Sequence, residues 1–314
     1  MKHVRAGIST ADNETMENEL SAAAKAPSHF LAWVPRMRPD SAIRQASGRS
    51  VAERARRPIS HVTGQKHLAG RVKAGDVIWL AGNDSRFGLR APSLDGRIAV
   101  ASCEPRGKGH AFLAGDDSYW LPWADAEDVF AGLELISAAG PTTTLKPPVW
   151  VHLQTTRQVA PAGAARLERH AAELLARPRL FISYRWLVEP KIVGGIVAAV
   201  ASSGFGPWWD RWSAPRGLST GIDKKEEGRG TSKPDLEELM AEGIEGSAAA
   251  LIVTDDHGNT SATAFERERI EARRLPLIEV GTEQLRQPSG LEALRRSLCG
   301  LYRDVTGRPA ERQH

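Results

Sequence analysis

The sequence predicts an α/β protein in which a C-terminal parallel sheet follows a mixed, mainly β N-terminal part. After residue 178, four apolar segments alternate with helical segments over short connections, a pattern typical of a doubly wound parallel sheet. The preceding half instead contains several short strands and few long helices. With 314 residues, of which 41% are hydrophobic and 25% charged, the chain is long enough to form two cores.

In the N-terminal part, β-rich segments bounded by turn residues predict strands at His29–Val34, Gly75–Gly82 and Leu94–Ser102. This composition favours a small barrel or a curled sheet. A helix is expected over Asp125–Leu135, followed by a proline-rich bridge at Pro141–Pro148.

The apolar spacing of Ala164–Ala176 predicts a connecting helix. The first C-terminal strand is Leu180–Tyr184, whose apolar run ends in polar residues, as expected for a buried strand that opens onto a crevice. The spacing within Val188–Ser203 is helical, and Gly204 closes this helix. The remaining predicted elements are strands at Phe205–Trp209, Ala248–Thr254 and Leu275–Val280, and a helix over 235–244.

Three motifs in this part resemble the Toll/interleukin-1 receptor (TIR) family. Phe181–Arg185 resembles the opening strand of that family, Gly204–Asp210 its second strand with a terminal acid, and Glu268–Ala272 its glutamate helix. The resemblance covers less than half of the chain and implies a flavodoxin-like fold. We therefore expect four segments: a loosely ordered N-terminus (1–28), a mainly β sensing or regulatory domain (29–160), a connecting helix (161–177) and a TIR domain (178–314).

In the enzymatic branch of the family, the matching glutamate cleaves the bond between nicotinamide and ribose in NAD. The resemblance therefore implies that Glu268 is the catalytic residue. It also implies that Tyr184, Arg185, Asp210 and Trp212 bind the substrate. The structural alternatives are a solvated carboxylate on a charged helix for Glu268, and an acid that caps a turn for Asp210. Trp208 and Trp209 are interpreted mainly as packing residues.

The sequence departs from the family pattern at Ala264, where many members carry tryptophan, and Phe265 can fill that space instead. The helix also contains Glu266, so a register shift of two residues would exchange the two glutamates. Residues two apart do not share a helix face, and only one of them can point into the site.

One carboxylate can suffice for this reaction because nicotinamide leaves a positively charged ring nitrogen as a neutral molecule. Ordinary glycoside cleavage requires two carboxyl groups. As the bond stretches, positive charge develops on the ribose, and a nearby anion stabilises that state more than the ground state. Two outcomes are possible for the ribose cation: capture by water, which is hydrolysis, or capture by the adenine ring of the same molecule, which is cyclisation.

No other catalytic pattern competes. The nine histidines are dispersed and the two cysteines, Cys103 and Cys299, lie far apart in sequence, so neither a metal site nor a disulfide framework is expected. No cofactor is predicted, since NAD would be the substrate. We expect a cytoplasmic protein without membrane association, since 192–209 lacks charge but contains glycines, serines and a proline.

Basic residues are concentrated between Arg36 and Lys73. That segment could contact the phosphates of a nucleic acid, or it could be a solvated basic surface. Two N-terminal strands also loosely resemble those of PUA and EVE barrels, which bind nucleic acid or modified bases.

Three functions therefore remain. The first is a bacterial defence or toxin NADase, regulated by its N-terminal domain and by self-association through the TIR domain. The second is a non-catalytic TIR scaffold. The third is a nucleic-acid or other ligand sensor that acts through the N-terminal domain.

Overall fold

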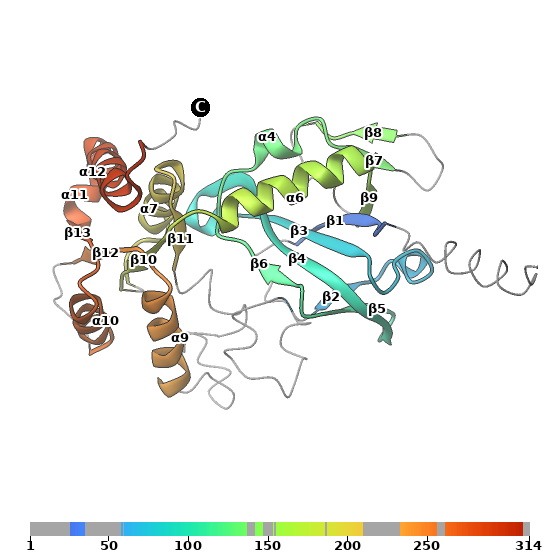
Figure 1. The fold of residues 1–314 in the computed structure, drawn as a ribbon, viewed down its shortest axis with the longest axis horizontal. Coiled ribbons are helices and arrows are strands. Elements are labelled where there is room, and N and C mark those ends of the chain that lie inside the picture. Colours follow the sequence, from blue (N-terminus) through green and yellow to red (C-terminus); the bar gives the residue numbers. More distant parts are fainter. Residues whose placement is uncertain are drawn as a thin grey trace, which may run out of the picture.

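The structure is a computed structural model that describes residues 26–34, 58, 60–136, 142–146, 153, 155–185, 187–209, 233–255 and 261–309. It contains two separate sheets that lie side by side (Figure 1), a mixed sheet from the N-terminal half and an all-parallel sheet from the C-terminal half. Within the described ranges, every helix is too short or too polar to cross a bilayer.

The N-terminal sheet has nine strands in the order β2-β5-β4-β3-β1-β9-β7-β8, with β6 paired to β4. The β1 and β3 strands are parallel and the other neighbours antiparallel, which makes the sheet mixed. In the described part of the chain, β2 and β8 do not pair, so the sheet is open and not a closed barrel. The strands are β1 (His29–Trp33), β2 (Ser60–Thr63), β3 (Val77–Asp84), β4 (Leu89–Arg106), β5 (Gly109–Ala114), β6 (Tyr119–Trp120), β7 (Glu134–Ile136), β8 (Thr142–Thr144) and β9 (Arg157–Val159).

Two N-terminal predictions need correction. The helix expected over Asp125–Leu135 is only the short α4 (Glu127–Phe130), because the chain turns at Gly132, whose φ is +78°. Strand β7 then begins at Glu134. The strand expected at Leu94–Ser102 is the middle of β4, which is 18 residues long and pairs with β3 along one part and with β5 along another.

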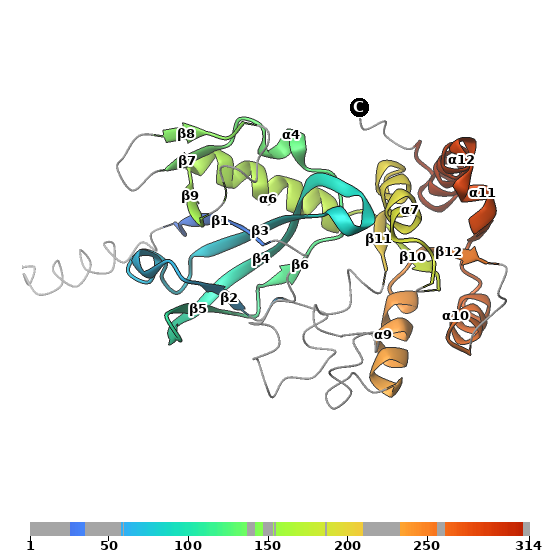
Figure 2. The same cartoon turned by 180° about the vertical axis from the view of Figure 1, so that it is seen from behind.

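The C-terminal sheet has the order β11-β10-β12-β13, and all its neighbours are parallel, as predicted. Helices α7 and α12 cover one face and α9 and α10 the other, with the strands between them (Figure 2). The connecting helix α6 lies over the N-terminal sheet (Figure 1). The elements are α6 (Pro161–Leu175), β10 (Arg179–Ser183), α7 (Pro190–Ser202), β11 (Gly206–Trp208), α9 (Lys233–Glu245), β12 (Ala249–Thr254), α10 (Ser261–Ala272), β13 (Leu277–Gly281), α11 (Thr282–Arg286) and α12 (Pro288–Thr306).

Alternation along β10 assigns its side chains to two different cores. Leu180 and Ile182 pack with α7 and α12, whereas Phe181 packs with α9 and α10. Ser183, the next residue on the Phe181 side, is also buried. The hydroxyl of Ser183 is therefore directed to the face that α9 and α10 cover.

The two halves share a hydrophobic core. The short helix η2 (Ser85–Phe87) follows β3 and packs against α7. Phe87, Leu89 and Trp123 of the N-terminal half belong to the same buried cluster as α7 and α12. This contact needs a glycine on the helix, because a Cβ atom at Gly194 would lie 1.8 Å from the carbonyl oxygen of Phe87.

Candidate functional site

A buried carboxyl group lies at the carboxyl end of β10, one of the two inner strands of the parallel sheet. The hydroxyl of Ser183, the last residue of β10, donates a hydrogen bond to the Oε2 atom of Glu266 on α10. The two residues are only 2% and 8% exposed. Carboxyl ends of parallel strands are where open α/β sheets bind their ligands. The carboxyl group of Glu266 thus lies at the expected edge of the sheet.

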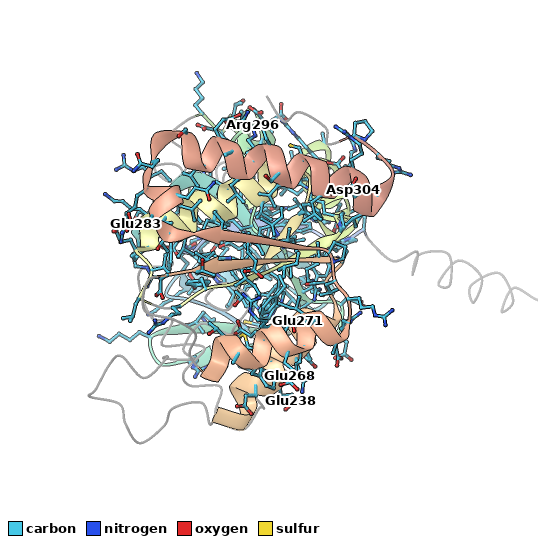
Figure 3. The ribbon with its side chains drawn as sticks, turned by 90° about the vertical axis from the view of Figure 1, so that its left-hand side faces the viewer. Glu238, Glu268, Glu271, Glu283, Arg296 and Asp304 are labelled. Carbon is cyan, nitrogen blue, oxygen red and sulfur yellow. The ribbon has the colours of Figure 1, made fainter. Side chains whose placement is uncertain are left out.

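The helical period explains why Glu266, and not its neighbours, faces the strands. Thr263, Glu266 and Ile270 are buried and recur at spacings of three and four residues, so they lie on one face of α10. Glu268 is displaced by about 200° around the helix from Glu266, and its side chain is exposed. Figure 3 shows Glu268 on the outer side of α10, away from the strands.

The structure therefore places the predicted catalytic residue Glu268 outside the strand-end site. Glu266, the alternative that a register shift of two residues would select, is the glutamate that faces the strand ends. The intervening Arg267 turns to the surface, where its guanidinium binds both carboxylate oxygens of Glu279 at 2.6 and 3.0 Å. This hydrogen-bonded pair lowers the pKa of Glu279 below its ordinary value.

An ion pair bridges the ends of two neighbouring strands. The guanidinium of Arg185, just after β10, lies 3.1 Å from the carboxylate of Asp255, just after β12. Their side chains are 18% and 11% exposed. The pair places one positive and one negative charge at the same edge of the sheet as Glu266. Arg185 was predicted as a substrate-binding residue, whereas Asp255 was not singled out.

Tyr184 is buried on the other side of the sheet. Its ring is part of the cluster that packs with α7 and α12, whereas Ser183 and Glu266 lie on the α9 and α10 side. The structure therefore does not bring the tyrosine ring to the carboxylate. Phe265, expected to fill the position of a family tryptophan, packs partly buried against the α9 and α10 cluster. The guanidinium carbon of Arg269 lies 4.6 Å from the centroid of the Phe265 ring.

Two further predicted site residues, Asp210 and Trp212, lie outside the described residues. Most of the basic segment from Arg36 to Lys73 does so as well. Among its described members, Arg71 donates a hydrogen bond to the side-chain oxygen of Gln158 at 2.8 Å, which fixes it against β9. Of the residues that the structure describes, no group of histidine, cysteine, aspartate and glutamate has an arrangement that could hold a metal ion.

Sequence reasoning missed Ser183 and Asp255, and named Glu266 only as an alternative. Alternation along β10 could have identified Ser183, because it lies two residues after the buried Phe181. Counting back four residues from Ile270, the one aliphatic residue in the charged part of α10, could have identified Glu266. No comparable sequence pattern identifies Asp255, apart from its position at the end of a strand.

Comparisons with known proteins identify no relative. A scan against protein-family models, a search of curated proteins and a search of solved structures each returned no match.

Proposed function

We propose that the C-terminal half is a flavodoxin-like TIR domain that cleaves the bond between nicotinamide and ribose in NAD, with Glu266 as the catalytic carboxylate. The observation that carries the proposal is the buried carboxylate of Glu266, which the hydroxyl of Ser183 orients at the carboxyl end of β10. The proposal replaces Glu268 of the sequence argument by the glutamate that faces the sheet. The proposal also depends on the three sequence motifs of the C-terminal half that resemble the TIR family.

The chemistry requires one oriented anion. When the bond between C1′ of the ribose and the ring nitrogen breaks, its electron pair stays with nicotinamide, which leaves as a neutral molecule. The ribose is left with cationic character. The carboxylate of Glu266 stabilises this cation, and it does so more strongly in a site from which water is excluded. Water then adds to C1′ and releases a proton, or an adenine nitrogen of the same molecule attacks C1′ and closes a ring.

Arg185 supports substrate binding in this proposal. A guanidinium is planar and always charged, which suits it to bind the pyrophosphate or ribose oxygens of NAD at the strand ends. The ion pair also holds the guanidinium in place before the substrate arrives. Asp210 and Trp212 retain their predicted roles as substrate-binding residues in the proposal.

A second candidate function, a non-catalytic TIR scaffold, is favoured by the depth at which Glu266 lies. A carboxylate that is 8% exposed and hydrogen-bonded to β10 can serve to fasten α10 to the sheet. In that case the domain would recruit other proteins and would not turn over NAD. In either case, we propose that the N-terminal half regulates self-association of the C-terminal half in a bacterial defence or toxin system.

The test is to incubate the full-length protein with NAD and measure free nicotinamide, both dilute and concentrated on a surface that promotes self-association. The enzyme proposal predicts nicotinamide release that rises on concentration and is lost in Glu266→Gln. Binding of NAD is measured in parallel by saturation transfer from protein to the nicotinamide protons. Absence of both binding and turnover in the concentrated protein supports the scaffold.

A further inference from the structure

A cavity of about 530 Å³ lies between the two halves of the protein, away from the carboxylate site. Its walls include the start of β10, the start of β11 and the residue before β12. These are the amino ends of parallel strands, so the cavity lies at the opposite end of the sheet from Ser183 and Glu266. The residues that line it come from β6, the C-terminal end of α6, β11 and α9, which are labelled in Figure 1. Its volume lies within the range of roughly 300–1,000 Å³ of small-molecule sites, which often occur between domains.

Each half contributes an indole ring to the walls. Trp120 of the N-terminal half packs so closely on β4 that a Cβ atom at Gly96 would lie 2.9 Å from its ring. Trp208 of the C-terminal half stacks on Phe181, with 5.0 Å between centroids and 21° between planes. A Cβ atom at Gly243 would lie 2.5 Å from its outer ring. Both indoles are therefore held in place by the fold and do not need to reorganise around a ligand.

The polar part of the wall has an excess of positive charge. Two cations, Arg177 and Arg179, and one anion, Glu242, line the cavity. The guanidinium of Arg179 lies over the backbone of Gly246, where a Cβ atom would be 2.6 Å from Nη1. Arg179 is an exposed residue, and the partial burial of its guanidinium among these walls lowers its pKa, which the nearby carboxylate of Glu242 offsets only in part. An anion in the cavity would form charge-assisted hydrogen bonds with this guanidinium.

We propose that this cavity binds a small anion with a planar ring, of the size and chemistry of a nucleoside monophosphate. The phosphate binds the two guanidinium groups, and the ring packs against the indoles. Glu242 accepts hydrogen bonds from amino or hydroxyl groups of the ligand. Because its walls come from both halves, an occupied cavity links the N-terminal sheet to the C-terminal sheet. This proposal does not depend on cleavage of NAD.

The experiment is isothermal titration of the full-length protein with AMP, GMP, CMP and UMP, with adenosine and inorganic phosphate as separate halves of the ligand. At least one nucleotide is expected to bind at least tenfold more tightly than either half. Arg179→Met, which keeps the aliphatic stem, removes a charge-assisted contact and should weaken that binding by about tenfold or more. Arg296→Met, on the exposed outer side of α12 (Figure 3), is the matched control and should bind normally.

A second pair of variants changes exposed residues, so that a loss of binding cannot be caused by a folding defect. Leu175 at the cavity wall is 51% exposed and Leu187, near the other end of β10, is 72% exposed, so both tolerate a polar side chain. Leu175→Glu places a negative charge beside the cavity and should weaken nucleotide binding, whereas Leu187→Glu should not. Glu266→Gln should also bind normally, which separates this cavity from the strand-end site.

The proposal is overturned if none of the four nucleotides binds at concentrations up to about 1 mM. It is equally overturned if a nucleotide binds and both Leu175→Glu and Arg179→Met retain the wild-type affinity. Binding that is lost in Glu266→Gln and kept in Leu175→Glu would assign the nucleotide to the strand ends and would also reject the cavity.

Discussion

The ring of Phe87 meets the indole of Trp209 edge to face, with 4.9 Å between ring centroids and 90° between ring planes. Phe87 belongs to the N-terminal half, whereas Trp209 directly follows β11 at the carboxyl end of the parallel sheet. Both residues are buried. The N-terminal half therefore contacts the sheet edge that contains the candidate site, and a change in one half can reach the other through this pair.

Removal of the Phe87 ring should lower the free energy of unfolding of the whole protein. Phe87→Ala deletes a side chain that is 4% exposed, and a buried phenylalanine replaced by alanine costs about 3–5 kcal/mol. Phe87→Leu fills most of the space and should cost less than half as much. Urea unfolding of both variants measures the difference. Equal unfolding midpoints for wild type and Phe87→Ala would show that the two halves do not share a core.

The contact between η2 and α7 can be tested from the helix side. Gly194→Ala introduces a Cβ atom 1.8 Å from the carbonyl oxygen of Phe87, so η2 must move away and we expect a loss of about 1–3 kcal/mol. Gly300→Ala on α12 is the control, because a Cβ atom there meets nothing within 4 Å. It should increase stability by up to about 1 kcal/mol through helix propensity. Thermal unfolding distinguishes these opposite signs, and a Gly194→Ala variant at least as stable as the wild type would refute the contact.

Ser183→Ala tests whether the hydroxyl orients Glu266. Loss of a buried hydrogen bond to a carboxylate should reduce the free energy of unfolding by about 1–3 kcal/mol. If Glu266 is catalytic, kcat should fall more than KM rises, because the substrate still binds while the anion is less well placed. Ser202→Ala on α7 removes a hydroxyl that donates a hydrogen bond to the backbone carbonyl of Ala199 on the same helix, and it should change stability by less than about 0.5 kcal/mol. Identical kinetics in both variants would remove Ser183 from the site.

The protein should lose stability in acid through His170 on α6. Burial, followed by the charges of Arg177 and Arg166, lowers its pKa from 6.5 to about 4 in the folded state. His170 therefore becomes protonated below pH 6.5 in the unfolded chain but only near pH 4 in the folded protein. This contribution to stability is complete above pH 6.5 and is lost as the pH falls towards 4, which amounts to about 2–3 kcal/mol at pH 4.5.

His170→Gln should remove that part of the pH dependence. Urea unfolding at pH 7.5 and pH 4.5 gives the change in unfolding free energy for each protein, and the change should be smaller in His170→Gln by about 2–3 kcal/mol. The exposed carboxylate of Glu173 lies 4.0 Å from the His170 ring in the folded protein. The variant Glu173→Gln therefore tests whether this carboxylate affects the pH dependence. An unaltered pH dependence in His170→Gln would contradict the depressed pKa.

Sequence alone predicted the parallel sheet because each buried strand is a short apolar run with a clear end. Leu251 and Val253, for example, lie in an uninterrupted apolar segment that can only be buried. The orientation of α10 was harder to predict. Charged residues surround most of that helix, and Ile270 alone marks its inner face in the part that contains both glutamates. The choice between Glu266 and Glu268 therefore depended on long-range packing.

The N-terminal half was predicted less well because its longest strand contains residues that usually end strands. Strand β4 includes Pro92 and Asp95, and the latter is buried with the hydroxyl of Ser93 donating to its carboxylate at 2.7 Å. Local composition thus placed the start of this strand at Leu94, whereas tertiary contacts extend it back through Pro92 to Leu89. Strands β7 and β9 are only three residues long, too short to produce a recognisable alternation.

The most direct test of the central claim is the ratio of nicotinamide release from NAD by two matched variants, Glu268→Gln and Glu266→Gln, both shown to keep the wild-type unfolding temperature. The two changes are chemically identical and lie two residues apart, but only Glu266 faces the end of β10. The account predicts near wild-type release from Glu268→Gln and a loss of about 100-fold or more in Glu266→Gln. Equal release from the two variants, or loss in Glu268→Gln alone, would contradict it.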